Sequence, residues 1–263
     1  MLTDAHFHAF DLERLDPGWI DFYRRSGMIG TASCHSLREF DHASALRKAA
    51  LSLRVSFGVH PQEPLPVELA NIERFASEAG IDAIGECGFD LFDARFAQTR
   101  DEQARIFQIQ VEMAKRYELP LVLHIRKAMS EIYTRAADLK GVRALIFHAW
   151  PGSPADATAL LKRGMNAFFS IGSQAINGRR LSVESIRSLP LDRILVETDA
   201  PYQRLRDSRV VVKPVLKQSD GHMFSKLEDL PLIYNALAAM RGIESEYFIH
   251  IVEKNFISAY DSY

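Results

Sequence analysis

Two histidines separated by one residue, His6 and His8, stand close to the start of the chain. On a β-strand alternate side chains share a face, so both imidazoles would point to the same side. Neutral imidazole is a common ligand of zinc, iron and similar ions. The pair alone is a weak signal, since an exposed strand end is the alternative, so its chemistry depends on whether further ligands reach the same place.

Four more residues of ligand type interrupt apolar runs later in the chain: Glu86, His124, His148 and Asp199. An unpaired polar group in such a run would cost a few kcal/mol, which argues against six unrelated core residues. Four imidazoles and two carboxylates are enough for two divalent ions, with Glu86 placed to bridge them. We therefore expect a site for two divalent metal ions, whose identity (zinc, manganese, iron or magnesium) the ligand types leave open.

Such a site suits hydrolysis. Two ions about 3.5–4 Å apart activate a water molecule and stabilise both the attacking and the leaving oxygen of a displacement. Asp199 would ligate metal and accept the proton of that water, so Glu86 and Asp199 are the expected catalytic residues. The sequence offers no serine or cysteine arrangement suited to nucleophilic catalysis, which leaves the metal-activated water as the expected nucleophile.

Apolar runs that alternate with helical patterns determine where these ligands lie. Besides the N-terminal strand that ends at His6 and His8, the runs predict strands over residues 28–34, 53–59, 81–86, 119–125, 142–147, 165–171 and 193–196. Helices are predicted around 19–23 and over 37–51, 67–79, 99–117, 128–139, 153–163, 182–189, 226–241 and 244–260, with a loop over 9–16. The strand runs are apolar throughout, as a parallel sheet covered on both faces requires.

Eight strands, each followed by helix, predict an α/β fold of the TIM-barrel type, one domain over residues 1–263. In such a barrel the active site lies at the carboxyl ends of the strands. The six ligand candidates would end the first, fourth, fifth, sixth and eighth strands, so the barrel brings them to one rim.

Composition indicates which partners and which cellular compartment to expect. The chain is 47% hydrophobic and 25% charged with a net charge of −2, which gives no bulk sign of a nucleic-acid or membrane partner. Two cysteines, Cys34 and Cys87, suit a reducing compartment better than a disulfide framework. We see no signal peptide and no apolar run near about 18 residues, and therefore expect a cytoplasmic monomer without a membrane span.

Motifs along the chain resemble those of the TatD-type metal-dependent hydrolases, a branch of the amidohydrolase-like barrels. They are residues 4–8 (DAHFH), 58–61 (GVHP), 85–90 (GECGFD), 123–126 (LHIR), 147–148 (FH), 196–202 (VETDAPY) and, near the C-terminus, 253–256 (EKNF). The matches span nearly the whole chain, and the stretches that contain Glu86 and Asp199 are the most specific.

The resemblance implies a TIM barrel and a divalent-metal-dependent deoxyribonuclease, often a 3′→5′ exonuclease, acting on DNA or another phosphodiester. It implies the same six metal ligands and suggests that His60 and Arg126 lie near the substrate phosphate. Arg126 suits that role because its planar guanidinium can hold a phosphate through two hydrogen bonds. Other amidohydrolases usually bridge their metals with a carboxylated lysine, so a glutamate at position 86 favours the TatD branch.

Several loops depart from the family pattern. The acid that usually follows Leu after the second histidine is shifted to Asp11, Lys127 stands where the family has Asp, and residues 149–152 read AWPG instead of Cys-Phe-Ser/Thr-Gly. The Arg-Asn-Glu-Pro segment after the eighth strand is replaced by a longer piece, residues 203–223. These changes spare the metal ligands but leave the substrate open, since loops on the catalytic face set specificity.

Two other functions remain open at this point. One is an amidohydrolase-type reaction on a small amide, lactone or phosphoester. The other is a barrel that binds nucleic acid or a partner without catalysis, for which loss of metal ligands would be the mark.

Smaller signals have two interpretations each. Asp4 orients a histidine ligand or forms a turn, Asp90 faces the site or caps a loop, and His35 lies on the rim with or without a role in the site. The thiol of Cys87 is expected to be buried. Basic residues at 179, 180, 204, 206, 209, 213 and 217 track a nucleic-acid backbone or are simply solvated, and Trp150 with Phe89 or Phe92 stacks on a base or packs in a loop.

Overall fold

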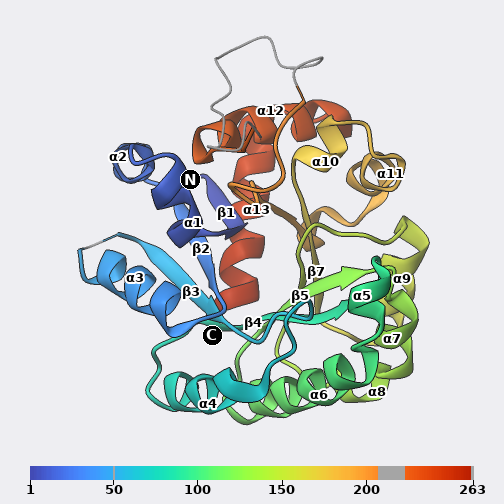
Figure 1. Ribbon diagram of the computed structural model, residues 1–263. Coiled ribbons are helices and arrows are strands. Elements are labelled where there is room, and N and C mark those ends of the chain that lie inside the picture. The colour runs from blue at the N-terminus through green and yellow to red at the C-terminus, as the bar shows by residue number, and fades with distance from the viewer. Residues whose placement is uncertain (50, 207–222, 262–263) are drawn as a thin grey trace.

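The computed structural model describes residues 1–49, 51–206 and 223–261. Eight strands form one parallel sheet in chain order, curved into a barrel (Figure 1). They are β1 (Thr3–Phe7), β2 (Ile29–Cys34), β3 (Leu53–Phe57), β4 (Ala83–Asp90), β5 (Leu121–Arg126), β6 (Leu145–Phe147), β7 (Ala167–Ile171) and β8 (Ile194–Val196). The predicted α/β TIM barrel is confirmed.

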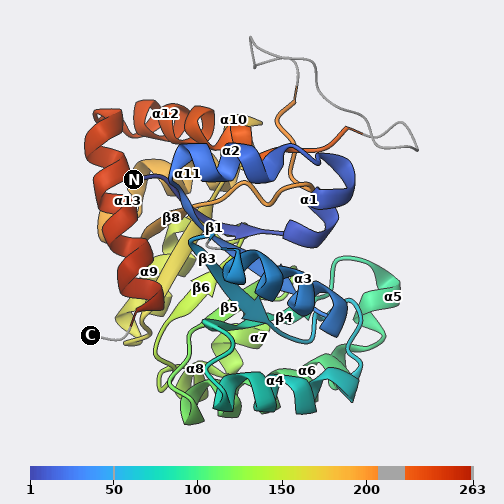
Figure 2. The same ribbon diagram turned by 90° about the vertical axis from the view of Figure 1, so that its left-hand side faces the viewer.

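Helices surround the strands (Figures 1 and 2). They are α1 (Ala9–Leu15), α2 (Trp19–Ser26), α3 (Leu37–Lys48), η1 (Pro66–Glu68), α4 (Leu69–Ser77), α5 (Ala94–Ala97), α6 (Arg100–Arg116), α7 (Met129–Thr134), α8 (Ala136–Leu139), α9 (Pro154–Lys162), α10 (Ser173–Ile176), α11 (Arg180–Ser188), η2 (Leu191–Arg193), η3 (Leu227–Asp229), α12 (Leu230–Arg241) and α13 (Ser245–Tyr260). Within the described ranges, none of these helices combines the length and apolar character needed to cross a bilayer.

Helix α13 covers the end of the barrel opposite the predicted site. Its residues Phe256, Ala259 and Tyr260 belong to a buried apolar cluster with lumen residues such as Ala5 and Phe168. A larger apolar cluster lies between the strands and the surrounding helices. The lumen is thus filled at one end, and its polar side chains lie at the other.

Residues that follow β8 close the barrel against β1. The amide of His8 donates to the carbonyl of Ala200 at 2.8 Å, and the amide of Asp199 donates to the carbonyl of His6 at 3.0 Å. The carboxylate of Asp4 accepts from the amide and the hydroxyl of Thr198, at 3.0 and 2.6 Å. The bonds that close the barrel therefore also hold Asp199 beside His6.

Several predicted boundaries are wrong. Residues 9–16, predicted as a loop, contain helix α1, in which Asp11 in the first turn and Arg14 in the last complement the helix dipole. The helix predicted over 128–139 divides into α7 and α8 at Arg135, and the short helices α5 and α10 were not predicted. Strands β4 and β5 extend to Asp90 and Arg126, so Glu86 and His124 lie inside their strands rather than at their ends.

Glycines explain why β4 continues through a segment predicted to end it. A Cβ added to Gly85, which has φ +149°, would lie 2.4 Å from the carbonyl oxygen of Val122, and one added to Gly58 would lie 2.6 Å from the Cα of Gly85. The register of β4 against β5 shifts between Ile84 and Cys87. The glycines thus let β3, β4 and β5 approach closely at the register shift that contains Glu86. An irregularity of this kind changes the direction of the side chains it carries.

We expect Gly85→Ala to lower the free energy of unfolding by about 3 kcal/mol, because its methyl group would overlap the β5 backbone. Urea denaturation of the variant measures this loss. The matched control is Gly18→Ala, whose new Cβ would lie no closer than 3.6 Å to its nearest neighbour, Asp16, and which should change stability by less than about 1 kcal/mol. Equal stability of the two variants would contradict the role assigned to Gly85.

Candidate metal centre

The carboxylate of Glu86 lies between two groups of imidazoles. Its Oε1 atom is 3.3 Å from His6 Nε2 and 3.6 Å from His8 Nε2. Its Oε2 atom is 3.2 Å from His148 Nε2 and 3.4 Å from His124 Nδ1. Glu86 is 2% exposed. The structure therefore brings the four predicted histidines to the two oxygens of one buried carboxylate.

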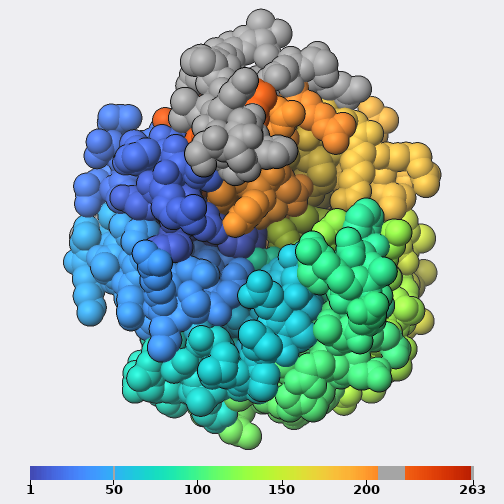
Figure 3. Space-filling view, viewed as in Figure 1, coloured from blue at the N-terminus to red at the C-terminus, as the bar shows by residue number. Residues whose placement is uncertain are grey.

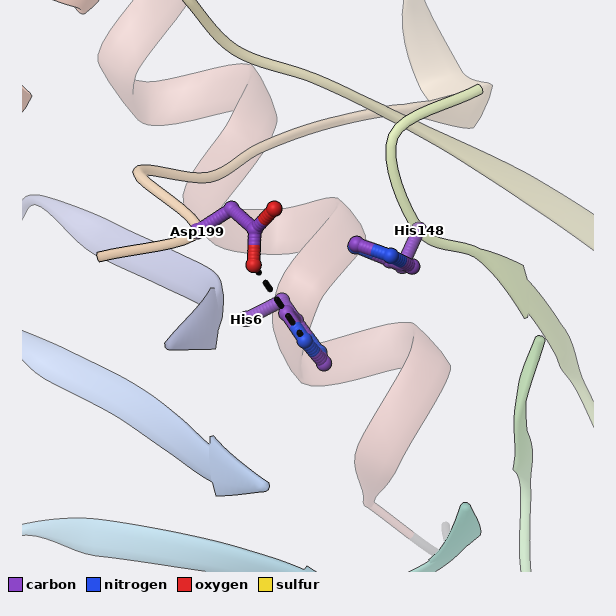
Figure 4. A group of neighbouring side chains, drawn as sticks. All are labelled: His6, His148 and Asp199. Atoms are coloured by element: carbon purple, nitrogen blue, oxygen red, sulfur yellow. Dashed lines mark ion pairs between the residues drawn. The ribbon is translucent and has the colours of Figure 1, made fainter. Parts of the chain in front are cut away.

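Asp199 completes the group at the Oε1 side. Its Oδ1 atom is 3.7 Å from His6 Nε2 and 3.5 Å from His8 Nε2, and those two nitrogens are 3.3 Å apart. Figure 4 shows Asp199 and His6 of this group beside His148, which faces Oε2; one ligand atom of each of the three residues lies within 4.8 Å of the others. Donor atoms at the corners of a tetrahedron around zinc, with bonds of about 2.0–2.1 Å, would be about 3.3 Å apart. The observed spacing therefore fits a divalent cation.

The group at the Oε2 side includes one more histidine. His60 Nε2 lies 3.9 Å from Glu86 Oε2, and the His60 ring stands 4.5 Å from the His124 ring. Burial, together with the neighbouring His124, lowers the pKa of His60 well below its usual value. A neutral His60 beside this group is suited to bind either a cation or a phosphate oxygen.

Two further carboxylates orient the histidines on this side. Asp90 Oδ2 lies 3.2 Å from His124 Nε2, and Glu197 Oε1 lies 3.6 Å from His148 Nδ1. Glu197 also accepts a hydrogen bond from the amide of Ala149 at 2.7 Å. Carboxylates behind imidazole ligands commonly set ring orientation and basicity. Asp90 thus faces the site. Asp4 accepts from the amides of His6 and Thr198 and does not contact an imidazole ring, which contradicts the first of its two interpretations.

The charges of the centre favour an ionised Glu86. Burial alone would raise the pKa of Glu86, but the imidazoles of His6 and His148 outweigh it and hold that pKa well below its usual range. Burial alone would lower the pKa of His148, but Glu86 and Glu197 raise it to about 10. Without a cation, the site therefore holds a negative carboxylate and at least one proton on a ligand nitrogen.

A cavity of about 690 Å³ opens over the centre and is visible as the hollow in the middle of Figure 3. Its size is typical of pockets for small ligands and cofactors. The predicted substrate residues His60 and Arg126 both line it. The guanidinium of Arg126 forms an ion pair with the Asp90 carboxylate at 3.3 Å, and its side chain is 43% exposed. No lysine of the described chain lines the cavity.

Two residues at the carboxyl end of β2 also reach Glu86, which the sequence analysis did not predict. His35 Nε2 lies 3.3 Å from Glu86 Oε1, and Ser33 Oγ donates to the same oxygen at 3.4 Å. The signal was present, because His35 directly follows the second strand on the predicted rim and Ser33 precedes it by two residues. The role of Glu197 was missed, although it belongs to the most specific motif.

The aromatic residues predicted to stack on a base or to pack in a loop differ in exposure. Trp150 is fully buried, with its ring 5.2 Å from Phe147 and 4.6 Å from Phe169, and Phe89 is also fully buried. Stacking of either residue on a base is therefore wrong. Phe92 is 55% exposed and lies 4.4 Å from the Arg126 guanidinium. The prediction that Cys87 is a buried thiol is confirmed.

The predicted basic cluster is only partly described. Arg209, Lys213 and Lys217, with most of the 203–223 segment, lie outside the described residues. Arg180 pairs with Glu184 at 2.9 Å. The other predicted basic residues, Arg179, Arg204 and Arg206, line a second hollow.

Comparison with known proteins decides the family. The family described as "TatD related DNase" matches residues 3–261. The chain belongs to this family. A TatD relative from Shigella flexneri, named 3′-5′ ssDNA/RNA exonuclease TatD, is 28% identical over 236 residues, which cover 88% of this chain and 85% of the relative. The protein of the same name from Cronobacter turicensis is 32% identical over 191 residues, 70% of each chain.

Solved structures agree on the TatD fold. The TatD homologue YJJV from Escherichia coli matches with a TM-score of 0.82 at 21% identity, covering 100% of this chain and 98% of that one. A hydrolase of the TatD family from Entamoeba histolytica matches with a TM-score of 0.81 at 16% identity, over 98% of this chain and 97% of its own. At these identities the likeness concerns the fold alone.

Proposed function

We propose that this chain is a divalent-metal-dependent nuclease that hydrolyses phosphodiester bonds in single-stranded DNA or RNA from the 3′ end. The observation that carries the proposal is the Glu86 carboxylate, each oxygen of which faces its own group of imidazoles. The substrate class is supported by relatives named 3′-5′ ssDNA/RNA exonuclease that align over most of this chain.

Two cations would be held, one on each side of Glu86. His6, His8 and Asp199 would hold the first with Oε1, and His124 and His148 would hold the second with Oε2. Mixed imidazole and carboxylate donors suit zinc, manganese or iron, and magnesium where waters complete the shell. When bound, the ions would lower the pKa of a water molecule and offset the charge that develops on the phosphate.

The side chains around the centre would accept the proton of the attacking water and bind the phosphate. Burial alone would raise the pKa of Asp199, but its hydrogen bond to His8 and the other imidazoles lower it, so the carboxylate is ionised and suited to accept the proton of the attacking water. Arg126 and His60 line the cavity and would hold the non-bridging oxygens of the phosphate. Asp90 would fix the guanidinium of Arg126 from behind.

The test is an assay on chelator-treated protein reloaded with Zn²⁺, Mn²⁺ or Mg²⁺. We expect single-stranded DNA labelled at its 5′ end to give a ladder that shortens from the 3′ end only when metal is present. A panel of amide, lactone and small phosphoester substrates separates the alternatives. Hydrolysis of an amide or lactone without cleavage of DNA would favour another amidohydrolase-type reaction. Tight DNA binding without any hydrolysis would indicate a non-catalytic barrel.

Protons should compete with the cation for the ligand nitrogen of His148, so metal affinity should depend on pH. The pKa of His148, about 10 before a cation binds, means that its ring is protonated at neutral pH, and a ligand imidazole must be neutral. We therefore expect the apparent association constant for Zn²⁺ to rise about tenfold per pH unit between pH 6 and 8, since that range lies below the His148 pKa. Calorimetry in buffers of different ionisation enthalpy measures the released proton. An affinity that does not change over this range would contradict the assignment.

We also propose a cytoplasmic monomer with one domain over residues 1–263. Both cysteines are buried free thiols, in keeping with a reducing compartment. Size-exclusion chromatography with light scattering tests the monomer, and a mass of twice 29.7 kDa would contradict it.

A further inference from the structure

A second hollow lies beside the metal centre, on the other side of Tyr202. Its volume is about 580 Å³, and its lining includes Gln174 and three arginines, Arg179, Arg204 and Arg206. We call it the arginine groove. The exposed side chain of Tyr202 lines both this groove and the cavity over the metal centre. A ligand that leaves the centre across Tyr202 therefore enters the arginine groove.

The backbone that carries Arg204 and Arg206 is held by hydrogen bonds to neighbouring side chains. The amide group of Asn177 donates to the carbonyl of Arg204 at 2.9 Å and accepts from the Arg206 amide at 2.9 Å. The hydroxyl of Ser173, the first residue of α10, donates to the carbonyl of Gln203. The backbone at Arg204 and Arg206 is thus held in place beside α10.

The groove contains donors without acceptors. Gln174 is 7% exposed, and its Oε1 accepts from the Gly172 amide at 3.0 Å, but its Nε2 has no hydrogen-bond partner among the described residues. A buried donor left unpaired is unfavourable, so an acceptor on a ligand would be favoured there. Arg179, Arg204 and Arg206 form no ion pair with a carboxylate of the described chain, although Arg204 donates to the sulfur of Met223, a weak acceptor, at 3.1 Å. Together these groups point to an anionic ligand.

The lining of the metal cavity has the reverse charge. Besides Glu86 and Asp199 it includes the carboxylates of Asp11, Glu39, Glu63 and Glu68, against a single arginine in that lining, Arg126. The Asp11 carboxylate accepts a hydrogen bond from the Tyr202 hydroxyl at 2.6 Å. Away from the metal ligands, a chain of phosphates would be repelled by this lining and attracted to the arginine groove.

We propose that the arginine groove binds backbone phosphates of the nucleic-acid strand that remains after cleavage, with a base stacked on Tyr202. This inference rests on the proposed nuclease function. It makes the preferred substrate a strand of several nucleotides rather than a small diester, because only a strand reaches from the centre into the groove. Arginine forks for phosphate and an exposed aromatic ring for a base are the parts from which single-strand binding tracks are built.

The test compares kcat/KM for two substrates, a ten-nucleotide single-stranded DNA and bis(p-nitrophenyl) phosphate, which has one phosphate. For Arg204→Gln/Arg206→Gln we expect a loss of about tenfold per arginine on the DNA, and a change of less than about twofold on the small diester. The slope of log kcat/KM against log salt should become shallower by about 0.7 for each phosphate that the variant no longer binds.

A second variant leaves the arginines in place. Gln174→Glu keeps the acceptor for the Gly172 amide but replaces the unpaired donor with a negative charge, and should also lower activity on the DNA alone. The matched control is Arg180→Gln, since Arg180 pairs with Glu184 and does not line the groove. Its activity on both substrates should equal that of the wild type.

The outcomes separate the groove from the proposed function. If the wild type cleaves both substrates and the groove variants behave like Arg180→Gln on the DNA, the groove assignment is wrong and the nuclease function stands. Equal losses on both substrates would also overturn the groove assignment, because they would indicate damage to the metal centre. If the metal-loaded wild type cleaves neither substrate, the proposed function fails and the groove inference fails with it.

Discussion

Replacing Glu86 with glutamine should reduce phosphodiester hydrolysis by about 10⁴-fold or more while the barrel remains folded. A glutamine amide has one oxygen and one nitrogen without a free lone pair, so it cannot bridge two cations. It also removes the negative charge that faces the imidazoles of both groups. Each factor of ten in rate corresponds to about 1.4 kcal/mol, and loss of a paired metal site removes several kcal/mol of transition-state stabilisation.

Two measurements check this expectation. The rate on 5′-labelled single-stranded DNA gives the activity, and elemental analysis of protein purified without chelator gives the metal content, which should fall. Glu112→Gln is the matched control, because Glu112 lies on an exposed face of α6 and its carboxylate accepts hydrogen bonds from Gln108 and Lys115 of the same helix. If metal-loaded Glu86→Gln has near wild-type turnover, Glu86 is not the bridge.

Asp199→Asn should lower kcat by about 10³-fold, with a smaller effect on KM. The asparagine keeps the size of the side chain and one oxygen that can still face His6 and His8, so much of the geometry survives. It cannot accept the proton of the attacking water, and general-base catalysis typically contributes about 10²–10⁴ in rate. The backbone bond from Asp199 to His6 that helps to close the barrel is unaffected.

The pH dependence distinguishes a lost base from a damaged site. In the wild type, activity should fall as pH is lowered and the ligand imidazoles and Asp199 become protonated. In Asp199→Asn the remaining activity should rise with hydroxide concentration instead of reaching a plateau. Asp101→Asn, at a fully exposed position, is the control and should match the wild type. Full activity of metal-loaded Asp199→Asn would rule out the proposed base.

Most of the fold could be predicted from sequence because parallel strands buried on both faces are apolar throughout. The polar residues that interrupt those runs then had to share one end of the barrel, which is why six candidates were placed correctly relative to one another. The positions of Glu86 and His124 inside their strands could not be predicted. They depend on how closely β3, β4 and β5 approach at Gly58 and Gly85, which is a property of neighbouring strands and not of the segment itself.

Side-chain partners were the hardest part to predict. His35 and Ser33 reach Glu86 because of the register between strands, and a one-residue shift would turn them away. Stacking on a base and packing in a loop were both open for Trp150, and the contacts with Phe147 and Phe169 that decide for packing come from two other segments of the chain. Glu197, the residue after β8, contacts His148, the residue after β6, although β7 lies between these two strands, and a contact of this kind depends on the barrel and not on either segment.

The most direct test of the paired metal centre is anomalous diffraction from crystals of the protein soaked in Mn²⁺. We predict two anomalous peaks, one on each side of the Glu86 carboxylate: the first among His6, His8 and Asp199, the second beside His124 and His148. A single peak, or peaks away from Glu86, would contradict the account.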